Sequence, residues 1–406
     1  MKTRILFVDD DLMALRGVER LLRSMRNEWE MEFVDSGPKA LERMAAAPFD
    51  AIVTDMRMPG MNGAQLLNEV MKRHPKTVRL VLSGYADSEL ILKCIGSTHQ
   101  YLAKPCDADA LRTTILRATS LEHSLENETL RQLVARCVSL PSVPALYSAL
   151  VEALQDPDTH LEKIGDIVAR DAAMMAKILK LVNSAFFGLR RQISNPQEAV
   201  AYLGVDTIKS LALAAHAFSQ YESSQQGPLS IAALWSHSLE VANAAKAVAN
   251  SEGAERKLVD EAYVAGLLHD VGKLVLATNL AEQYAQVLNL ARNEKVTLTT
   301  AERQVFGADH ADMGGYLLGL WGLPVPVVEA IAYHHQPDRA LTTSFTPLTA
   351  THVGNVLASA QWPAVDGLPA SDLDMMYLAK IGLEDHVKAW RQAWSDRATA
   401  SRAHEF

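Results

Sequence analysis

The sequence predicts an α/β domain, a doubly wound five-stranded parallel sheet, followed by an all-α helical domain. Up to about residue 119, five short β-branched runs alternate with longer amphipathic segments. This alternation is typical of a parallel sheet covered on both faces. From residue 145 to the end only helical periods recur, such as Ile164, Ile167 and Val168, and no strand is expected there. The 406 residues are enough for two or three domains that each bury a core.

The individual elements follow from apolar periodicity. The expected strands cover residues 4–8, 31–34, 51–54, 79–83 and 100–103. One helical face between the first two strands is indicated by Leu15, Val18, Leu22 and Met25. In the all-α half, Thr299 followed three residues later by Glu302 has the form of a capping box at a helix start.

A helical connector is expected between the two halves. Residues 107–137 lack Pro and Gly, and an apolar stripe continues to Leu121 and Leu125. Two interpretations stay open: a last helix packed on its own sheet, or a rigid connector that pairs with a second copy in a homodimer. Pro141 and Pro144 then end the helix. The expected domains are residues 1–119, a connector at 120–138, a helical domain at 139–337 and a helical C-terminal extension at 338–406.

Composition limits the class of protein. The net charge of −9 disfavours a general DNA-binding surface, and no recognition helix for DNA is evident. The chain has no apolar stretch long enough to span a membrane. The three cysteines, Cys94, Cys106 and Cys137, are scattered and lack CxxC spacing. A cytoplasmic protein with reduced thiols is expected.

Chemistry-bearing residues fall at the ends of four expected strands. Asp9 and Asp10 follow the first strand, Asp55 the third, Ser83 ends the fourth and Lys104 follows the fifth. The carboxyl ends of parallel strands meet at one edge of the sheet, where open α/β folds bind ligands. A phosphoryl group attacked by a carboxylate needs a divalent cation to cancel the repulsion between the two anions.

Each of these residues has an expected role in phosphoryl transfer. Asp55 would accept the phosphoryl group, and the Lys104 ammonium would contact the phosphoryl oxygens. The Ser83 hydroxyl would donate a hydrogen bond to one of those oxygens. Mg²⁺ would be held by four groups: Asp9, Asp10, Asp55 and the backbone carbonyl of Arg57.

On these residues, positions 1–119 resemble a response-regulator receiver domain. The resemblance implies a phosphoprotein of a two-component system, with a cognate sensor histidine kinase as partner and a self-limiting aspartyl phosphate on Asp55. It also implies Mg²⁺ as cofactor and Tyr101 as the aromatic residue that changes rotamer when the hydroxyl moves. The bond between Lys104 and Pro105 matches the family's cis-proline bond.

Histidines are the second set of chemistry-bearing residues. A polar pair inside an apolar helix, such as His269-Asp270, is costly to bury unless it binds something. Imidazoles and a carboxylate suit Fe, Mn or Zn. The alternative is a set of core histidines that satisfy one another. The candidate metal ligands are His237, His269, Asp270, His310, His334, His335 and His352.

The helical half resembles the HD superfamily, and more closely its HDOD branch (HD-related output domain). Ala172 stands where that branch commonly has proline. The matching segments, in chain order, are 140–144, 167–171, 177–188, 199–204, His269-Asp270, 306–310, 320–324 and His334-His335.

Three departures disfavour hydrolysis of a cyclic dinucleotide by this half. The late helix has no aspartate to close the metal site, so His352 or Asn355 would have to substitute. No Gly-Tyr-Pro element follows His335, and Ala233 stands where related phosphodiesterases often have a glutamate. The leading hypothesis is therefore a response regulator whose HDOD domain passes the signal to an unidentified downstream signalling protein by contacts. The rival is a phosphorylation-gated, metal-dependent phosphohydrolase.

Overall fold

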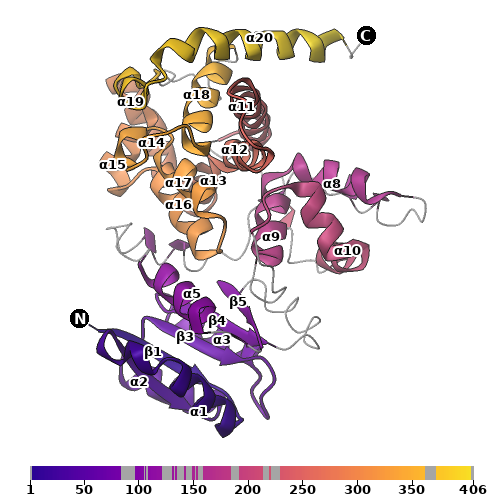
Figure 1. Cartoon of the computed structure of the whole chain (residues 1–406). Coiled ribbons are helices and arrows are strands. Elements are labelled where there is room, and N and C mark those ends of the chain that lie inside the picture. The colour runs from indigo at the N-terminus through magenta and orange to yellow at the C-terminus, as the bar shows by residue number, and fades with distance from the viewer. Residues whose placement is uncertain are drawn as a thin grey trace.

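The computed structural model separates a sheet-containing domain from a helical half (Figure 1). No helix among the residues that the structure describes is long and apolar enough to cross a membrane. The predicted turn at Pro105 and most of the predicted connector lie outside those residues. The described residues are 2–83, 97–104, 106, 108–120, 130–131, 133–134, 141–142, 149–150, 152–153, 159–183, 192–213, 219–220, 229–361 and 372–403.

The first domain is built on five parallel strands. They lie in the order β2-β1-β3-β4-β5, which confirms the predicted doubly wound sheet. The central strands are buried on both faces, as their unbroken apolar runs predict. The strands are β1 (Thr3–Val8), β2 (Trp29–Val34), β3 (Ala51–Asp55), β4 (Val78–Ser83) and β5 (Gln100–Ala103).

Helices cover both faces of this sheet. The first helix ends at Leu21, so Met25 of the predicted apolar face lies in a short 3₁₀ segment and is still buried. Asn62 and Gln65 form a capping box at the start of α3. The helices are α1 (Leu12–Leu21), η1 (Arg23–Asn27), α2 (Gly37–Ala46), α3 (Gly63–Arg73) and α5 (Ala108–Ser120).

The second half is helical, as predicted. One correction is the strand pair β6 (Pro141–Ser142) and β7 (Ser219–Gln220), because two residues are too few to give a period in the sequence. The helices are α8 (Leu161–Ala169), α9 (Ala172–Val182), α10 (Pro196–Leu213), α11 (Ile231–Ser251), α12 (Arg256–Leu268), α13 (Val271–Asn279), α14 (Ala281–Glu294), α15 (Leu298–Phe306), α16 (His310–Leu320), α17 (Val325–Tyr333), η4 (Pro337–Arg339) and α18 (Pro347–Gln361).

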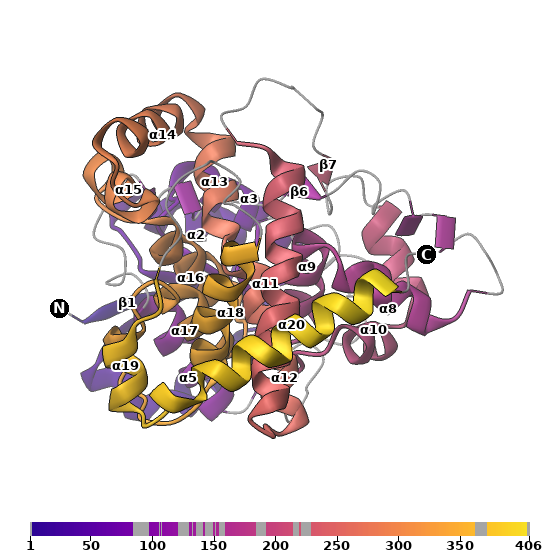
Figure 2. The same ribbon diagram turned by 90° about the horizontal axis from the view of Figure 1, so that it is seen from above.

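The C-terminal segment packs on this bundle. It contains α19 (Met375–Lys380), η5 (Glu384–His386) and α20 (Val387–Ala403), and α20 crosses α11 (Figure 2). Trp390 is fully buried, and its Nε1 donates a 2.7 Å hydrogen bond to Glu252 at the end of α11. The segment therefore shares a core with the helical half.

The two halves touch where β5 and α5 meet the turn between α16 and α17. Gln100 of β5 donates to the carbonyl of Leu320 at 3.1 Å, and Arg117 of α5 donates to the carbonyl of Leu323 at 2.5 Å. From α9, Lys180 donates to the carbonyl of Thr98 at 2.6 Å, and its Nζ lies 4.9 Å from the ring centroid of Trp321.

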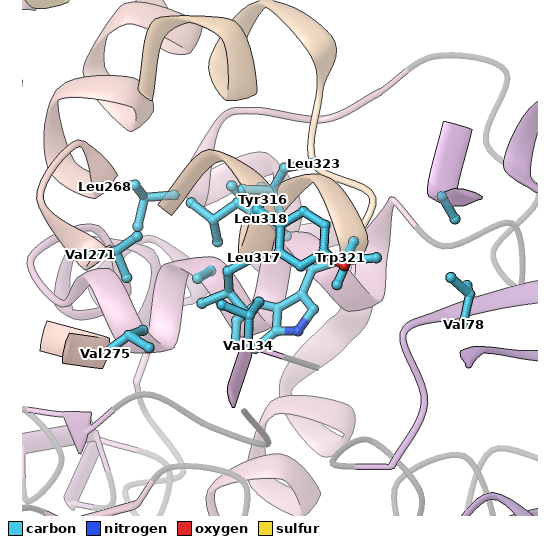
Figure 3. Packing of buried hydrophobic residues seen from close by; sticks show 14 of the residues in the cluster. Val78, Val134, Leu268, Val271, Val275, Tyr316, Leu317, Leu318, Trp321 and Leu323 are labelled. Carbon is cyan, nitrogen blue, oxygen red and sulfur yellow. The ribbon is translucent and has the colours of Figure 1, made fainter. Parts of the chain in front are cut away.

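Buried apolar side chains continue across this contact. Trp321 belongs to one hydrophobic cluster with Tyr316, Leu323 and receiver-side Val78 (Figure 3). The turn between α16 and α17 is therefore held by polar contacts to the first domain and by apolar packing around its tryptophan.

We expect Trp390→Ala to destabilise the helical half by about 3–5 kcal/mol, because it removes a fully buried indole and leaves Glu252 without this donor. Urea unfolding followed by circular dichroism measures the loss. Lys388→Ala, on the exposed face of the same helix, is the control and should change stability by less than about 0.5 kcal/mol. An unchanged midpoint for Trp390→Ala would show that the C-terminal segment is dispensable for the fold.

Candidate functional site

The acidic site of the first domain is assembled at the carboxyl edge of its sheet. Asp9 follows β1, Asp55 ends β3, and both side chains are buried. Lys104, just beyond β5, lies 2.6 Å from Asp9 Oδ2 and forms an ion pair with Asp55 as well. The structure thus brings together three of the predicted residues from three different strands.

Backbone amides orient the two carboxylates. Asp55 Oδ2 accepts from the Arg57 amide at 2.6 Å, and Asp9 Oδ1 accepts from the Asp11 amide at 2.9 Å. Gly63 closes the loop on the site, because a Cβ at this position would lie within 3.1 Å of the Met56 backbone. A larger residue there would push the loop away from Asp55.

Burial and charge oppose each other at this site. Burial raises the pKa of Asp55, and the Lys104 ammonium offsets part of that rise. Burial also favours neutral Lys104, but the two carboxylates outweigh it and raise the pKa of the lysine. A buried, anionic pair of carboxylates held by one cation is chemically suited to a divalent ion, which prefers such oxygen donors. Asp10 is exposed beside the site and can supply a further oxygen.

The remaining predicted receiver residues lie on β4 and β5. Ser83 pairs with Ala103 in the strand ladder, which places it at the correct sheet edge. Its side chain lies outside the described residues. Tyr101 is buried and pairs with Val81. The roles of Ser83 and Tyr101 stay predictions.

Six of the seven predicted metal ligands converge in the helical half. They form two groups that share Asp270, with the ligand atoms of each group within 4.8 Å of one another. One group contains Asp270, His310, His334 and His335; the other contains His237, His269 and Asp270. The residues come from α11, the α12–α13 junction, the start of α16 and the end of α17.

Two of these histidines, His269 and His334, are held by backbone carbonyls with Nε2 facing the shared aspartate. The Nδ1 of His269 contacts the Gly266 carbonyl at 2.7 Å, and that of His334 contacts the Ile331 carbonyl at 2.8 Å. Because a carbonyl oxygen can only accept, each Nδ1 carries the proton and each Nε2 keeps its lone pair. This arrangement is typical of histidines that bind metal.

Glu302 is a site residue that the sequence interpretation missed. The cap of α15 is Thr297, whose hydroxyl accepts from the Thr300 amide, so the predicted pairing of Thr299 with Glu302 is wrong. Glu302 is instead fully buried, and its Oε2 accepts from His310 Nδ1 at 2.6 Å. The turn at Gly307, with φ of 76°, redirects the chain so that Glu302 of α15 reaches His310 at the start of α16.

His352 does not join the cluster. Its Nδ1 donates to the His334 carbonyl at 2.8 Å, and its Nε2 accepts from the Asp374 amide at 3.0 Å. With both ring nitrogens engaged by backbone, it cannot substitute for a closing aspartate, which corrects that prediction. It ties the C-terminal segment to the end of α17 instead.

The electrostatics favour the neutral, metal-ligating form of three of the histidines and the protonated form of a fourth, His310. Burial lowers the pKa of His269 and of His335, and lowers that of His334 to about 3, so all three are neutral. For His310 burial acts in the same direction, but Glu302 outweighs it and raises the pKa to about 9. The Asp270 carboxylate has a pKa held well below its usual value, because neighbouring His269 and Lys273 outweigh its burial.

Buried atoms without partners mark the centre of the cluster. Within the described part of the chain, His269 Nε2 and His334 Nε2 are buried and make no hydrogen bond, and buried Asp270 Oδ1 forms an ion pair with His310 Nε2 at 3.2 Å. Each is an atom that can donate a lone pair to a metal, and an unpartnered buried polar atom is otherwise costly. The residues therefore fit a divalent transition metal.

Comparison with known protein families supports this division of the chain. Residues 5–116 match the response regulator receiver domain, and residues 140–337 match the HDOD domain. The chain therefore joins a response regulator receiver domain to an HDOD domain. Both resemblances inferred from the sequence are confirmed.

Individual relatives are distant. An uncharacterized protein of Treponema pallidum is 24% identical over 263 residues, covering 64% of this chain and 50% of the relative. The hydrogenase regulator HoxA of Cupriavidus necator is 29% identical, covering 44% and 39%. A cyclic di-GMP phosphodiesterase of Thermotoga maritima is 29% identical, covering 50% and 57%. The chain thus spans about half or less of the first curated relatives it matches.

Solved structures also resemble the chain. The MmoQ response regulator of Methylococcus capsulatus is 25% identical with a TM-score of 0.47, covering 62% of this chain and 98% of that one. An HDOD protein of Geobacter sulfurreducens is 25% identical with a TM-score of 0.40, covering 72% and 96%.

The pairing of Glu302 with His310 predicts a pH dependence of the metal-free protein. A histidine pKa raised from 6.5 to about 9 stabilises the fold fully below pH 6.5, and this stability is lost as the pH rises through 9. The loss is on the order of 3 kcal/mol. Glu302→Gln keeps a hydrogen-bond acceptor but removes the charge, so its stability should fall much less across this range.

Thermal unfolding in the presence of chelator, measured between pH 6.5 and 9, compares how much stability the wild type and Glu302→Gln lose as the pH rises. His269, His334 and His335 have lowered pKa values, so they affect stability below this window rather than within it. Parallel curves for the wild type and Glu302→Gln would contradict the assigned pairing.

Proposed function

We propose that this protein is a two-component response regulator that accepts a phosphoryl group on Asp55 from a sensor histidine kinase. The proposal rests on one observation: at one edge of the sheet, Lys104 forms ion pairs with both Asp9 and Asp55. Asp9, Asp10, Asp55 and the Arg57 carbonyl would hold Mg²⁺, which supplies charge neutralisation during transfer. The Asp55 carboxylate forms the new bond to phosphorus as the bond to the kinase histidine breaks.

The signal would pass to the HDOD domain through β5. This strand carries Tyr101 in its interior, Lys104 follows its end, and Gln100 at its start contacts the Leu320 carbonyl. A phosphoryl group on Asp55 would draw Lys104 toward its oxygens, since the lysine now neutralises the bare carboxylates. Movement of β5 would then reach the turn between α16 and α17 and change what the HDOD domain contacts.

A metal-dependent phosphohydrolase is the second candidate. The unpartnered Nε2 atoms of His269 and His334 favour metal binding, and a relative is a cyclic di-GMP phosphodiesterase. Against hydrolysis, α18 carries no aspartate or glutamate and His352 is engaged elsewhere. We therefore propose that the HDOD domain binds Fe, Mn or Zn and acts through contacts with a downstream protein. The expected cytoplasmic location and the homodimer alternative stay predictions.

Labelling with a small phosphodonor tests the phosphorylation site. Wild-type protein in Mg²⁺ and acetyl phosphate should gain one phosphoryl group, detected by intact-mass spectrometry, and lose it on standing. Asp55→Asn should gain none, because its amide is a poor nucleophile. Asp35→Asn alters another aspartate just past a strand end and should label like the wild type. Equal labelling of Asp55→Asn would refute the assignment.

Hydrogen exchange tests the route to the HDOD domain. After phosphorylation, the amides of Gly322 and Leu323, which bond to Gly319 and Leu318, should exchange about fivefold faster or more. Arg117→Ala removes a contact to this turn and should mimic the change without phosphorylation. Asp55→Asn with the phosphodonor is the control. Unchanged exchange of the turn in phosphorylated protein would exclude β5 and α5 as the route.

A further inference from the structure

We propose that the HDOD domain holds one metal ion rather than two, and that the Lys273 ammonium takes the place of a second. The single ion would bind Asp270 Oδ1 with His310, His334 and His335. This inference rests on the proposed metal binding and is independent of phosphorylation at Asp55.

The two oxygens of Asp270 face different surroundings. Around Oδ1 lie His310 Nε2 at 3.2 Å and His334 Nε2 at 4.0 Å, and His335 Nε2 is 3.0 Å from His310 Nε2. This oxygen is buried and forms an ion pair with His310 Nε2. Three imidazoles and one carboxylate oxygen complete a four-coordinate site.

The Oδ2 side is already neutralised. Lys273 Nζ lies 2.7 Å from Oδ2, whereas His269 Nε2 lies at 3.4 Å and His237 Nε2 at 3.9 Å. The lysine is one turn along from Asp270, and its own amide donates to the Asp270 carbonyl at 2.9 Å. A metal ion on Oδ2 would be next to this ammonium, and the two cations would repel each other strongly in a buried site.

Ligand number leads to the same conclusion. Among the residues that the structure describes, the Oδ2 group has two imidazoles besides the shared aspartate. The helix that would close it, α18, contributes no carboxylate, and its His352 faces the Asp374 amide. A second metal ion would therefore bind through three protein ligands and share its one carboxylate with the first ion, which is too weak a set to displace the Lys273 ammonium.

Buried negative charge is concentrated on the Oδ1 side. Glu302 is fully buried and accepts from both the Nδ1 and the backbone amide of His310. It holds His310 with Nε2 toward Asp270 and adds an anion behind this one ligand. Behind His269, by contrast, Nδ1 contacts the Gly266 carbonyl rather than a carboxylate of the described chain.

Titration with Co²⁺ tests the inference, because its visible spectrum reports imidazole coordination. Excess Mg²⁺ occupies the carboxylate site of the receiver but competes poorly for histidine ligands. Wild-type protein should bind one equivalent, measured by absorbance and by metal content after gel filtration. His310→Ala should lose it, His237→Ala should keep it, and Lys273→Met should gain a second equivalent.

Controls make each outcome decisive. Lys246→Met removes another lysine of the bundle, which packs over Tyr263, and should bind one equivalent. If circular dichroism shows that His310→Ala is unfolded, His335→Ala provides the same test. Two equivalents in the wild type, loss of metal in His237→Ala, or a single equivalent in Lys273→Met would each overturn the inference. If no Co²⁺ binds, both this inference and the proposed metal binding are wrong. The proposed phosphorylation of Asp55 is tested separately, by labelling with the phosphodonor.

Discussion

Buried carboxylates matched by a lysine are the interaction on which both functional regions depend. Asp55 and Asp9 are removed from water at the edge of the sheet, and Lys104 contacts both. Asp270 is removed from water among helices, and Lys273 contacts one of its oxygens. An unpaired buried anion would cost several kcal/mol. Each lysine therefore holds its site in a charged form that a metal ion or a phosphoryl group can alter.

Helix α16 connects the second of these regions to the first domain. It begins at His310, a member of the histidine cluster, and ends at Leu320, whose carbonyl accepts from Gln100 of β5. Eleven residues of α-helix span about 16 Å and behave as a stiff rod. Every residue of this helix except Asp312 is buried, so a displacement at its C-terminal turn is carried to its N-terminus rather than absorbed. The fold thus places the receiver contact and the histidines on one rigid element.

The sequence predicted those parts of the structure that are determined by short, continuous stretches of the chain. Asp9, Asp55 and Lys104 follow short apolar strands, and the parallel order of those strands is enough to bring them together. Glu302 was misassigned because its spacing from Thr299 imitates a cap, whereas its partner His310 lies across a turn. The bond from Gln100 to Leu320 joins residues 220 positions apart, and no periodicity encodes such a contact.

The character of the metal site also bears on whether the HDOD domain catalyses. A hydrolytic centre keeps a coordination position open for water, whereas a site filled by four protein ligands is structural. Asp270 Oδ1 with His310, His334 and His335 supplies four such ligands. The position beside Oδ2, where a second ion could activate water, is occupied by Lys273. A closed site at the start of α16 would stiffen the helix that the receiver contacts, which suits an output domain that acts through its surface better than one that cleaves a phosphate ester.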